Sequence, residues 1–80
     1  MARAIPEVVA MKILRRPQVE DRTGLSRSTI YAKIIANEFP ESVRLGRRAV
    51  GWVESEIDEW MMAQIRRSRQ AQAKILKSNA

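Results

Sequence analysis

A short strand and a short helix are predicted where the apolar positions of the chain first form a pattern. Ile13-Leu14 stands between basic residues, which is typical of a short strand at the edge of a sheet. Pro17 suits the first turn of a helix, because its missing N–H would have no partner there, and we expect a helix over residues 17–23. This helix turns mainly Val19 toward the core, and Gly24 ends it.

A second helix is expected between Ser26 and Pro40. The Ser26 hydroxyl suits an N-cap, and Leu25 and Ile30 flank it as a hydrophobic staple. At 100° per residue the positions that follow separate into two sides. The apolar side holds Ile30, Tyr31, Ile34 and Ile35, and the opposite side holds Ser28, Thr29, Ala32, Lys33 and Ala36.

Alternating apolar residues between 43 and 52 predict a β-hairpin. A loop of four residues, Gly46–Ala49, keeps the apolar side chains on one face and leaves Arg47 and Arg48 at the tip. A two-residue loop would put Arg48 on the apolar side, so we favour the longer loop. The pairs that it predicts are Leu45 with Val50 and Val43 with Trp52.

A last helix is expected from about Glu54. Ser55–Asp58 resembles a capping box, and the acids between 54 and 60 suit the positive end of a helix dipole. Beyond residue 66 the apolar pattern weakens, and Ile75 and Leu76 either extend the helix, pack on another subunit or fray. The residues expected to face the core are Val53, Ile57, Trp60, Met61 and Ile65.

Eighty residues allow one small domain, and the order of elements defines its class. We expect a mainly α, small winged helix-turn-helix with the order helix, helix, β-hairpin, helix. Residues 1–11 are expected to form a flexible arm, residues 12–66 the domain, and residues 67–80 a helix extension or tail.

Composition narrows the chemistry. The chain has no cysteine and no histidine, which excludes a disulfide framework, a zinc finger and a Cys/His nucleophile. The missing histidine also disfavours most hydrolytic chemistry, although it leaves carboxylate chemistry open. We expect no enzyme activity, no metal and no cofactor. No run of about 18 apolar residues is present, so no membrane contact is expected and a cytoplasmic location fits best.

The charge is strongly basic and unevenly distributed. Fifteen Lys and Arg against nine Asp and Glu give a net charge of +6, which favours a polyanionic partner. The acids at 54–60 are interpreted as a helix start rather than as catalytic carboxylates. Arg66, Arg67 and Arg69 are either a solvated helix end or a second patch that contacts phosphates.

The two helices joined at Gly24 have the pattern of a helix-turn-helix. The second helix has a small polar outer side that would fit a major groove about 12 Å wide. Arg27 in its first turn can reach a guanine edge or a phosphate, and the Tyr31 hydroxyl can donate to a phosphate. A helical hairpin packed only for stability is the alternative.

The hairpin is the second basic element. Its arginines, Arg44, Arg47 and Arg48, can lie over a phosphate backbone or enter a minor groove. The alternative is an edge hairpin that its charges keep soluble. Phe39, Trp52 and Trp60 are interpreted as core residues rather than as a surface that stacks a ligand.

Several blocks of residues in fixed order resemble the AlpA-type prophage regulators. They are Gly24–Tyr31 (GLSRSTIY), Phe39-Pro40, Arg44-Leu45-Gly46, Gly51-Trp52 and Ser55–Trp60 (SEIDEW), within residues 13–62. Pro17 departs from the pattern, since such proteins more often have a polar or aliphatic residue there.

The resemblance implies a MerR-like, excisionase-like winged helix that binds double-stranded DNA and regulates transcription of a prophage or other mobile element. An excision factor that bends attachment-site DNA for a recombinase is one alternative, and a basic adaptor for an acidic protein or RNA is another. Because one module covers little DNA, we expect a homodimer or a side-by-side assembly, at the nucleoid when bound. The expected DNA-binding residues are Ser26, Arg27, Ser28, Thr29, Tyr31 and Lys33 in the second helix and Arg44, Arg47 and Arg48 in the wing.

Overall fold

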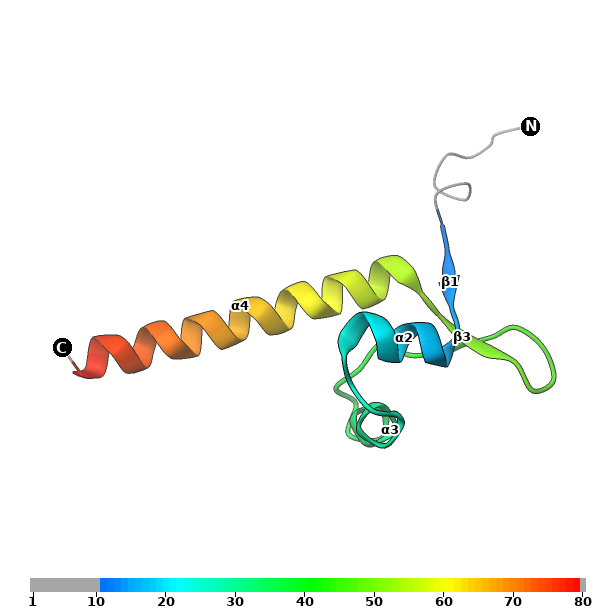
Figure 1. Cartoon of the computed structure of the whole chain (residues 1–80), viewed down its shortest axis with the longest axis horizontal. Helices are drawn as coiled ribbons and strands as arrows, with labels where there is room; N and C mark the ends of the chain where they lie inside the picture. Colours follow the sequence, from blue (N-terminus) through cyan, green and yellow to red (C-terminus); the bar gives the residue numbers. More distant parts are fainter. Residues whose placement is uncertain (1–10, 80) are drawn as a thin grey trace.

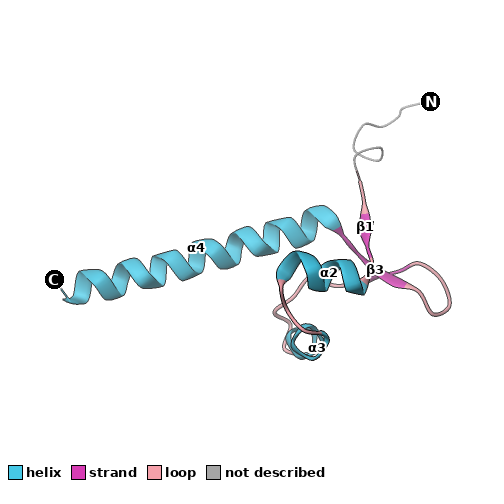
Figure 2. Cartoon of the chain, viewed as in Figure 1, coloured by secondary structure: helices cyan, strands magenta, loops and turns pink. Residues whose placement is uncertain are grey.

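Three helices and a small sheet make up the described part of the chain, residues 11–79, in a computed structural model (Figures 1 and 2). Side chains are described for residues 11–74. The expected arm lies outside this range except for Met11. The elements are β1 (Ile13–Leu14), α2 (Arg16–Thr23), α3 (Arg27–Ile35), β2 (Val43–Arg44), β3 (Val50–Val53) and α4 (Glu54–Asn79). Their order confirms the predicted winged helix-turn-helix class.

The sheet has three antiparallel strands in the order β1-β3-β2. Central strand β3 pairs Trp52 with Leu14 of β1 and Gly51 with Val43 of β2. The strand predicted at Ile13-Leu14 is confirmed, and it covers the edge of β3 that the hairpin leaves free. The pairing of β1 with β3 joins segments that are far apart in the sequence, because β1 precedes helices α2 and α3 and β3 follows them.

The predicted register of the hairpin is wrong by one residue. Val43 pairs with Gly51 instead of Trp52, and five residues, 45–49, form the loop. The backbone N–H groups of Leu45 and Gly46 both donate to the Ala49 carbonyl, at 2.7 and 3.1 Å. Leu45 therefore leaves the expected core face and is 48% exposed.

Gly51 gives the physical reason for this register. A Cβ at Gly51 would lie 2.4 Å from Ile13 Cγ2, 2.9 Å from the Leu14 carbonyl oxygen and 3.1 Å from Leu45 Cδ1. The side chains of Ile13 in β1 and of Leu45, which directly follows β2, thus close over the glycine on the face opposite Trp52. The sheet has apolar contacts on both faces, whereas the predicted pairing assumed only one.

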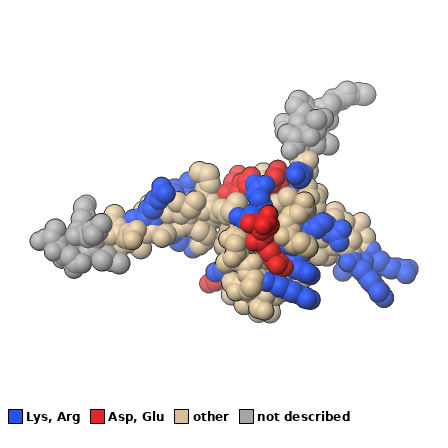
Figure 3. Space-filling view, viewed as in Figure 1, with Lys and Arg blue, Asp and Glu red and all other residues tan. Residues whose placement is uncertain are grey.

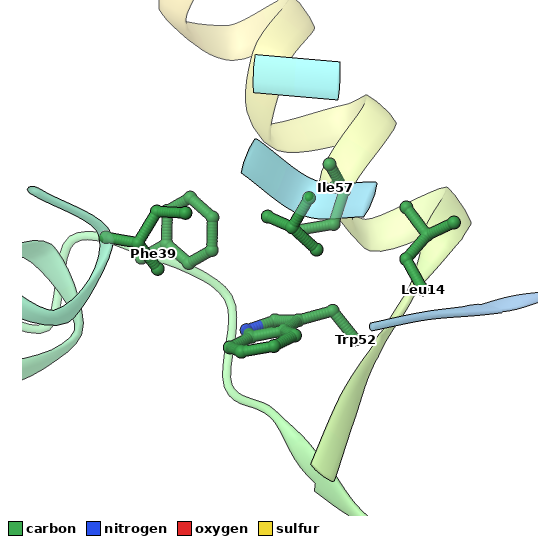
Figure 4. Packing of buried hydrophobic residues seen from close by; sticks show 6 residues of the cluster. Leu14, Phe39, Trp52 and Ile57 are labelled. Carbon is green, nitrogen blue, oxygen red and sulfur yellow. The ribbon is translucent and has the colours of Figure 1, made fainter. Parts of the chain in front are cut away.

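The core forms where the sheet meets the three helices. Trp52, which is almost fully buried, occupies its centre beside Leu14, Phe39 and Ile57 (Figure 4). Its indole Nε1–H donates to the Pro40 carbonyl at 3.1 Å, so burial leaves no polar atom unpaired. The buried residues are Leu14, Val19, Ile30, Phe39, Trp52 and Ile57, with Leu25, Ile34, Val50, Trp60 and Met61 packed against them. The interpretation of the aromatic residues as core is confirmed.

Helix α4 begins at Glu54, as predicted, and continues to Asn79. Ser55 is its second residue and not its cap, and the Glu54 N–H instead donates to the Lys12 carbonyl at 2.8 Å. Ile65 is 49% exposed, so the expected core face of this helix ends four residues earlier, at Met61. The rest of α4 extends away from the other elements (Figure 1).

Arg22 joins α2 to the first two turns of α4. Its guanidinium contacts the Glu54 carboxylate at 2.8 Å and the Asp58 carboxylate at 2.5 Å. Asp58 and, second, Glu54 raise the pKa of Arg22. In the part of the chain that the structure describes, none of the helices has the length and apolar character that crossing a membrane requires.

Candidate nucleic-acid interface

The turn between α2 and α3 has the geometry that the sequence predicts. Gly24 has φ 74°, and its N–H donates to the Glu20 carbonyl at 2.7 Å, which ends α2. Ser26 caps α3, because its Oγ accepts a hydrogen bond of 3.2 Å from the Thr29 N–H. The Ser26 hydroxyl also donates to Thr29 Oγ1 at 2.9 Å. The hydroxyls of these two predicted site residues therefore bond to each other.

The predicted division of α3 into two sides is partly wrong. Ile30 is buried and Ile34 half-buried, as expected, but Tyr31 is 39% exposed and Ile35 is 86% exposed. Ile35 lies about 140° from Ile30 around the helix. The core covers only the part of the α3 surface around Ile30, because few side chains of the small core pack against this helix.

Two residues of the expected outer side lie partly against the protein. Thr29 and Lys33 are half-buried, and Lys33 lines the surface hollows between α3 and α4 together with Trp60 and Gln64. Ser28 is exposed as expected. The structure thus brings Arg27, Ser28 and Tyr31 together on the open face of α3 and leaves Lys33 at its border.

Arg27 and Tyr31 form a stacked pair on this open face. The Arg27 guanidinium carbon lies 5.8 Å from the centroid of the Tyr31 ring, within the range of a cation–π contact. Such stacking restricts the arginine to fewer rotamers. The contact places the Arg27 guanidinium over the Tyr31 ring on the open face.

Arg16 is a basic residue that the sequence reasoning did not include in the site. Its Nε donates to Glu20 Oε2 at 3.0 Å, and the Glu20 carboxylate and, second, the Tyr31 side chain raise its pKa. The effect of Tyr31 on this pKa indicates that Arg16 of α2 lies near Tyr31. The four-residue spacing of Arg16 and Glu20 was the signal for the ion pair, but no local pattern indicated the proximity to Tyr31.

The wing carries its arginines in the open. Arg44 at the end of β2 and Arg47 and Arg48 in the loop are all exposed. Figure 3 shows basic side chains at the loop, on the right, and around α3, below, whereas acidic side chains gather over α2 and the start of α4. The loop and the far end of α4 lie at opposite ends of the molecule (Figure 1).

A helix-turn-helix followed by an arginine-bearing β-hairpin defines a small winged helix-turn-helix protein. The family model described as Prophage CP4-57 regulatory protein (AlpA) matches residues 12–65, and the chain belongs to this family. The resemblance seen in the sequence blocks is thereby confirmed.

Two relatives have clear sequence similarity to the chain. It is 44% identical over 61 residues to the uncharacterized protein ORF88 of Enterobacteria phage P4, covering 76% of this chain and 69% of that protein. It is 43% identical over 58 residues to the DNA-binding transcriptional activator AlpA of Escherichia coli (strain K12), covering 65% of this chain and 83% of that protein.

Proposed function

We propose that this protein is a sequence-specific regulator of transcription that binds double-stranded DNA of a prophage or other mobile element. The open face of α3 carries the proposal: Ser26 caps the start of this helix, and its outer residues are not covered by other described elements. The similarity to an activator that binds DNA supports the same role. The protein acts by binding, without catalysis, in the cytoplasm and at the nucleoid when bound.

In the proposed mechanism, α3 enters the major groove. Nine residues give a helix about 13.5 Å long, which spans roughly four base pairs. Arg27 reaches a guanine edge or a phosphate, while Ser28 and Tyr31 lie along the groove. Ser26, Thr29 and Lys33 act at the rim of the groove, through hydroxyl groups and a lysine charge beside the phosphates.

The wing supplies the second set of contacts. Arg44, Arg47 and Arg48 lie along the phosphate backbone next to the α3 groove, where they add affinity without reading sequence. A module of this size contacts little DNA, so we propose that it binds as a homodimer or as copies side by side.

Two measurements on the full chain test the proposal. Fluorescence anisotropy with labelled mixed-sequence duplex DNA should show binding at low salt that weakens as salt rises. Selection from random duplexes should then yield one preferred sequence. Absence of binding at either salt concentration would refute the proposal, and binding of RNA or an acidic protein in its place would favour the adaptor.

A footprint on the selected and neighbouring DNA separates the two DNA-binding roles. One compact site near a promoter supports the transcription regulator. Several adjacent sites at an attachment locus, with bent DNA, would instead indicate an excision factor that works with a recombinase.

A further inference from the structure

The open face of α3 consists of two parallel rows of exposed side chains, each with a spacing of four residues. One row has short side chains, which allow the helix backbone to approach a surface closely. The other row has long side chains, which reach further. The short row is Ser28, Ala32 and Ala36, and the long row is Arg27, Tyr31 and Ile35.

Ile35 is the unusual member of the long row. At 86% exposure it is the most exposed large hydrophobic residue in the described part of the chain. A single exposed apolar side chain is ordinary on a protein surface. Ile35, however, continues the row that starts with the stacked pair of Arg27 and Tyr31, and it lies beside Ala32 and Ala36. The polar face of α3 therefore ends in an apolar patch.

We propose that Ile35 determines sequence specificity by contacting the C5-methyl group of a thymine in the major groove. This inference rests on the proposed function, since it requires α3 to lie in that groove. Base-pair edges there present nitrogen and oxygen groups for hydrogen bonding and one apolar group, the thymine methyl. Because an isoleucine side chain has no donor or acceptor, that methyl is the feature that it can favour.

The length of the row predicts where the thymine lies. Ile35 comes eight positions after Arg27 in the helix, a rise of about 12 Å, which equals three to four base-pair steps. Arg27 and Ile35 therefore reach different base pairs. Where Arg27 reads a guanine, the preferred site carries a thymine three to four pairs away from it.

Deoxyuridine tests the contact directly, because it lacks only the methyl group of thymine. The probe is the duplex selected by the wild-type chain, made once with thymine and once with deoxyuridine at every thymine of the bound site. The wild type should bind the thymine duplex about three- to fivefold more tightly, the effect of burying one methyl group. Ile35→Ala should bind the two duplexes equally, and Ile35→Val should keep part of the preference.

Met62→Ala is the matched control, because Met62 is also an exposed apolar residue, 56% exposed, but lies on α4. It should show the wild-type ratio. Circular dichroism and thermal unfolding of Ile35→Ala should match the wild type, since the side chain lies outside the core.

Two results would overturn the inference while leaving DNA binding intact. One is a wild-type chain that binds both duplexes equally, and the other is an Ile35→Ala chain that keeps the full thymine preference. If Ile35→Ala lost only cooperative binding of several copies, Ile35 would contact a second copy and not the base. Failure of every variant to bind DNA would instead refute the proposed function itself.

Discussion

Arg27 and Arg47 are both exposed arginines, but Arg27 belongs to a helix and Arg47 to a loop. Arg27 lies in the first turn of a capped helix and stacks on Tyr31, whereas Arg47 lies in a five-residue loop. A base contact needs an ordered side chain, and a phosphate contact needs mainly charge. Arg27→Ala should therefore change which sequences a selection recovers.

Arg47→Ala is the contrasting variant. It should weaken binding to all sequences alike and reduce the slope of log affinity against log salt by about one unit, as the loss of one phosphate contact does. Anisotropy titrations with the selected duplex and with a scrambled one measure both variants. Equal losses on both duplexes from both variants would contradict this division of roles.

Gly24 and Gly46 form a second matched pair of residues, this time for stability. A Cβ at Gly24 would contact nothing within 4 Å, yet the backbone φ of 74° disfavours any residue with a side chain. Gly24→Ala should therefore lower stability by about 1 kcal/mol, or ~4–8 °C in the unfolding midpoint of a domain this small.

Gly46→Ala is the control, because its Cβ would meet only Ala49 Cβ at an ordinary 3.9 Å. Its φ lies outside the left-handed region, so its midpoint should stay near that of the wild type. Calorimetry on both variants checks the pair. A midpoint for Gly24→Ala equal to that for Gly46→Ala would show that the turn does not need the left-handed residue.

At the scale of the elements, Arg22 connects the helix-turn-helix to α4 through two carboxylates. Arg22→Gln should lower the unfolding midpoint at low salt, and the difference from the wild type should shrink in about 1 M NaCl, where exposed charges are screened. Arg66→Gln, an exposed arginine further along α4, should leave the midpoint unchanged. A loss that high salt does not reduce would mean that Arg22 acts through packing.

Local signals predicted the helices well. Gly24 and Ser26 mark helix ends in the structure as they do in the sequence, because each acts on a backbone group within a few residues. Glu54 also begins its helix as predicted, but its N–H bonds to the carbonyl of the distant Lys12. The outcome differs where distant strands meet. The register of the hairpin depends on Ile13 closing over Gly51, and no pattern within residues 43–52 contains that information.

The candidate site shows the same limit. The position of the open face of α3 could be predicted from the N-cap, and the exposure of the wing arginines from their place in the loop. The width of the open face could not be predicted from the sequence, because it depends on how much of the α3 surface the core covers. For that reason Tyr31 and Ile35 were expected to face inward, and the neighbour of Tyr31 from α2, Arg16, was missed.

At the scale of the whole molecule, α4 continues well beyond the residues that pack against the core of the domain. Its last residue packed against the core is Met61, and the family match ends at residue 65, but the helix continues to Asn79. The side chains of residues 65–74 are exposed. A chain ending at residue 66 should therefore keep its fold, with a midpoint within a few degrees of the full chain. This truncation tests the predicted domain boundary.

The same truncation decides what the basic residues of α4 do. It removes Arg67, Arg69 and the two lysines that follow, so a tail whose four charges all contact phosphates would take about 3.6 units from the salt slope. The far half of α4 points away from the wing (Figure 1). We therefore expect the slope at a single site to stay unchanged and any loss to appear only in binding of several copies. A reduced slope at a single site would instead make this half of α4 a third DNA-contacting element.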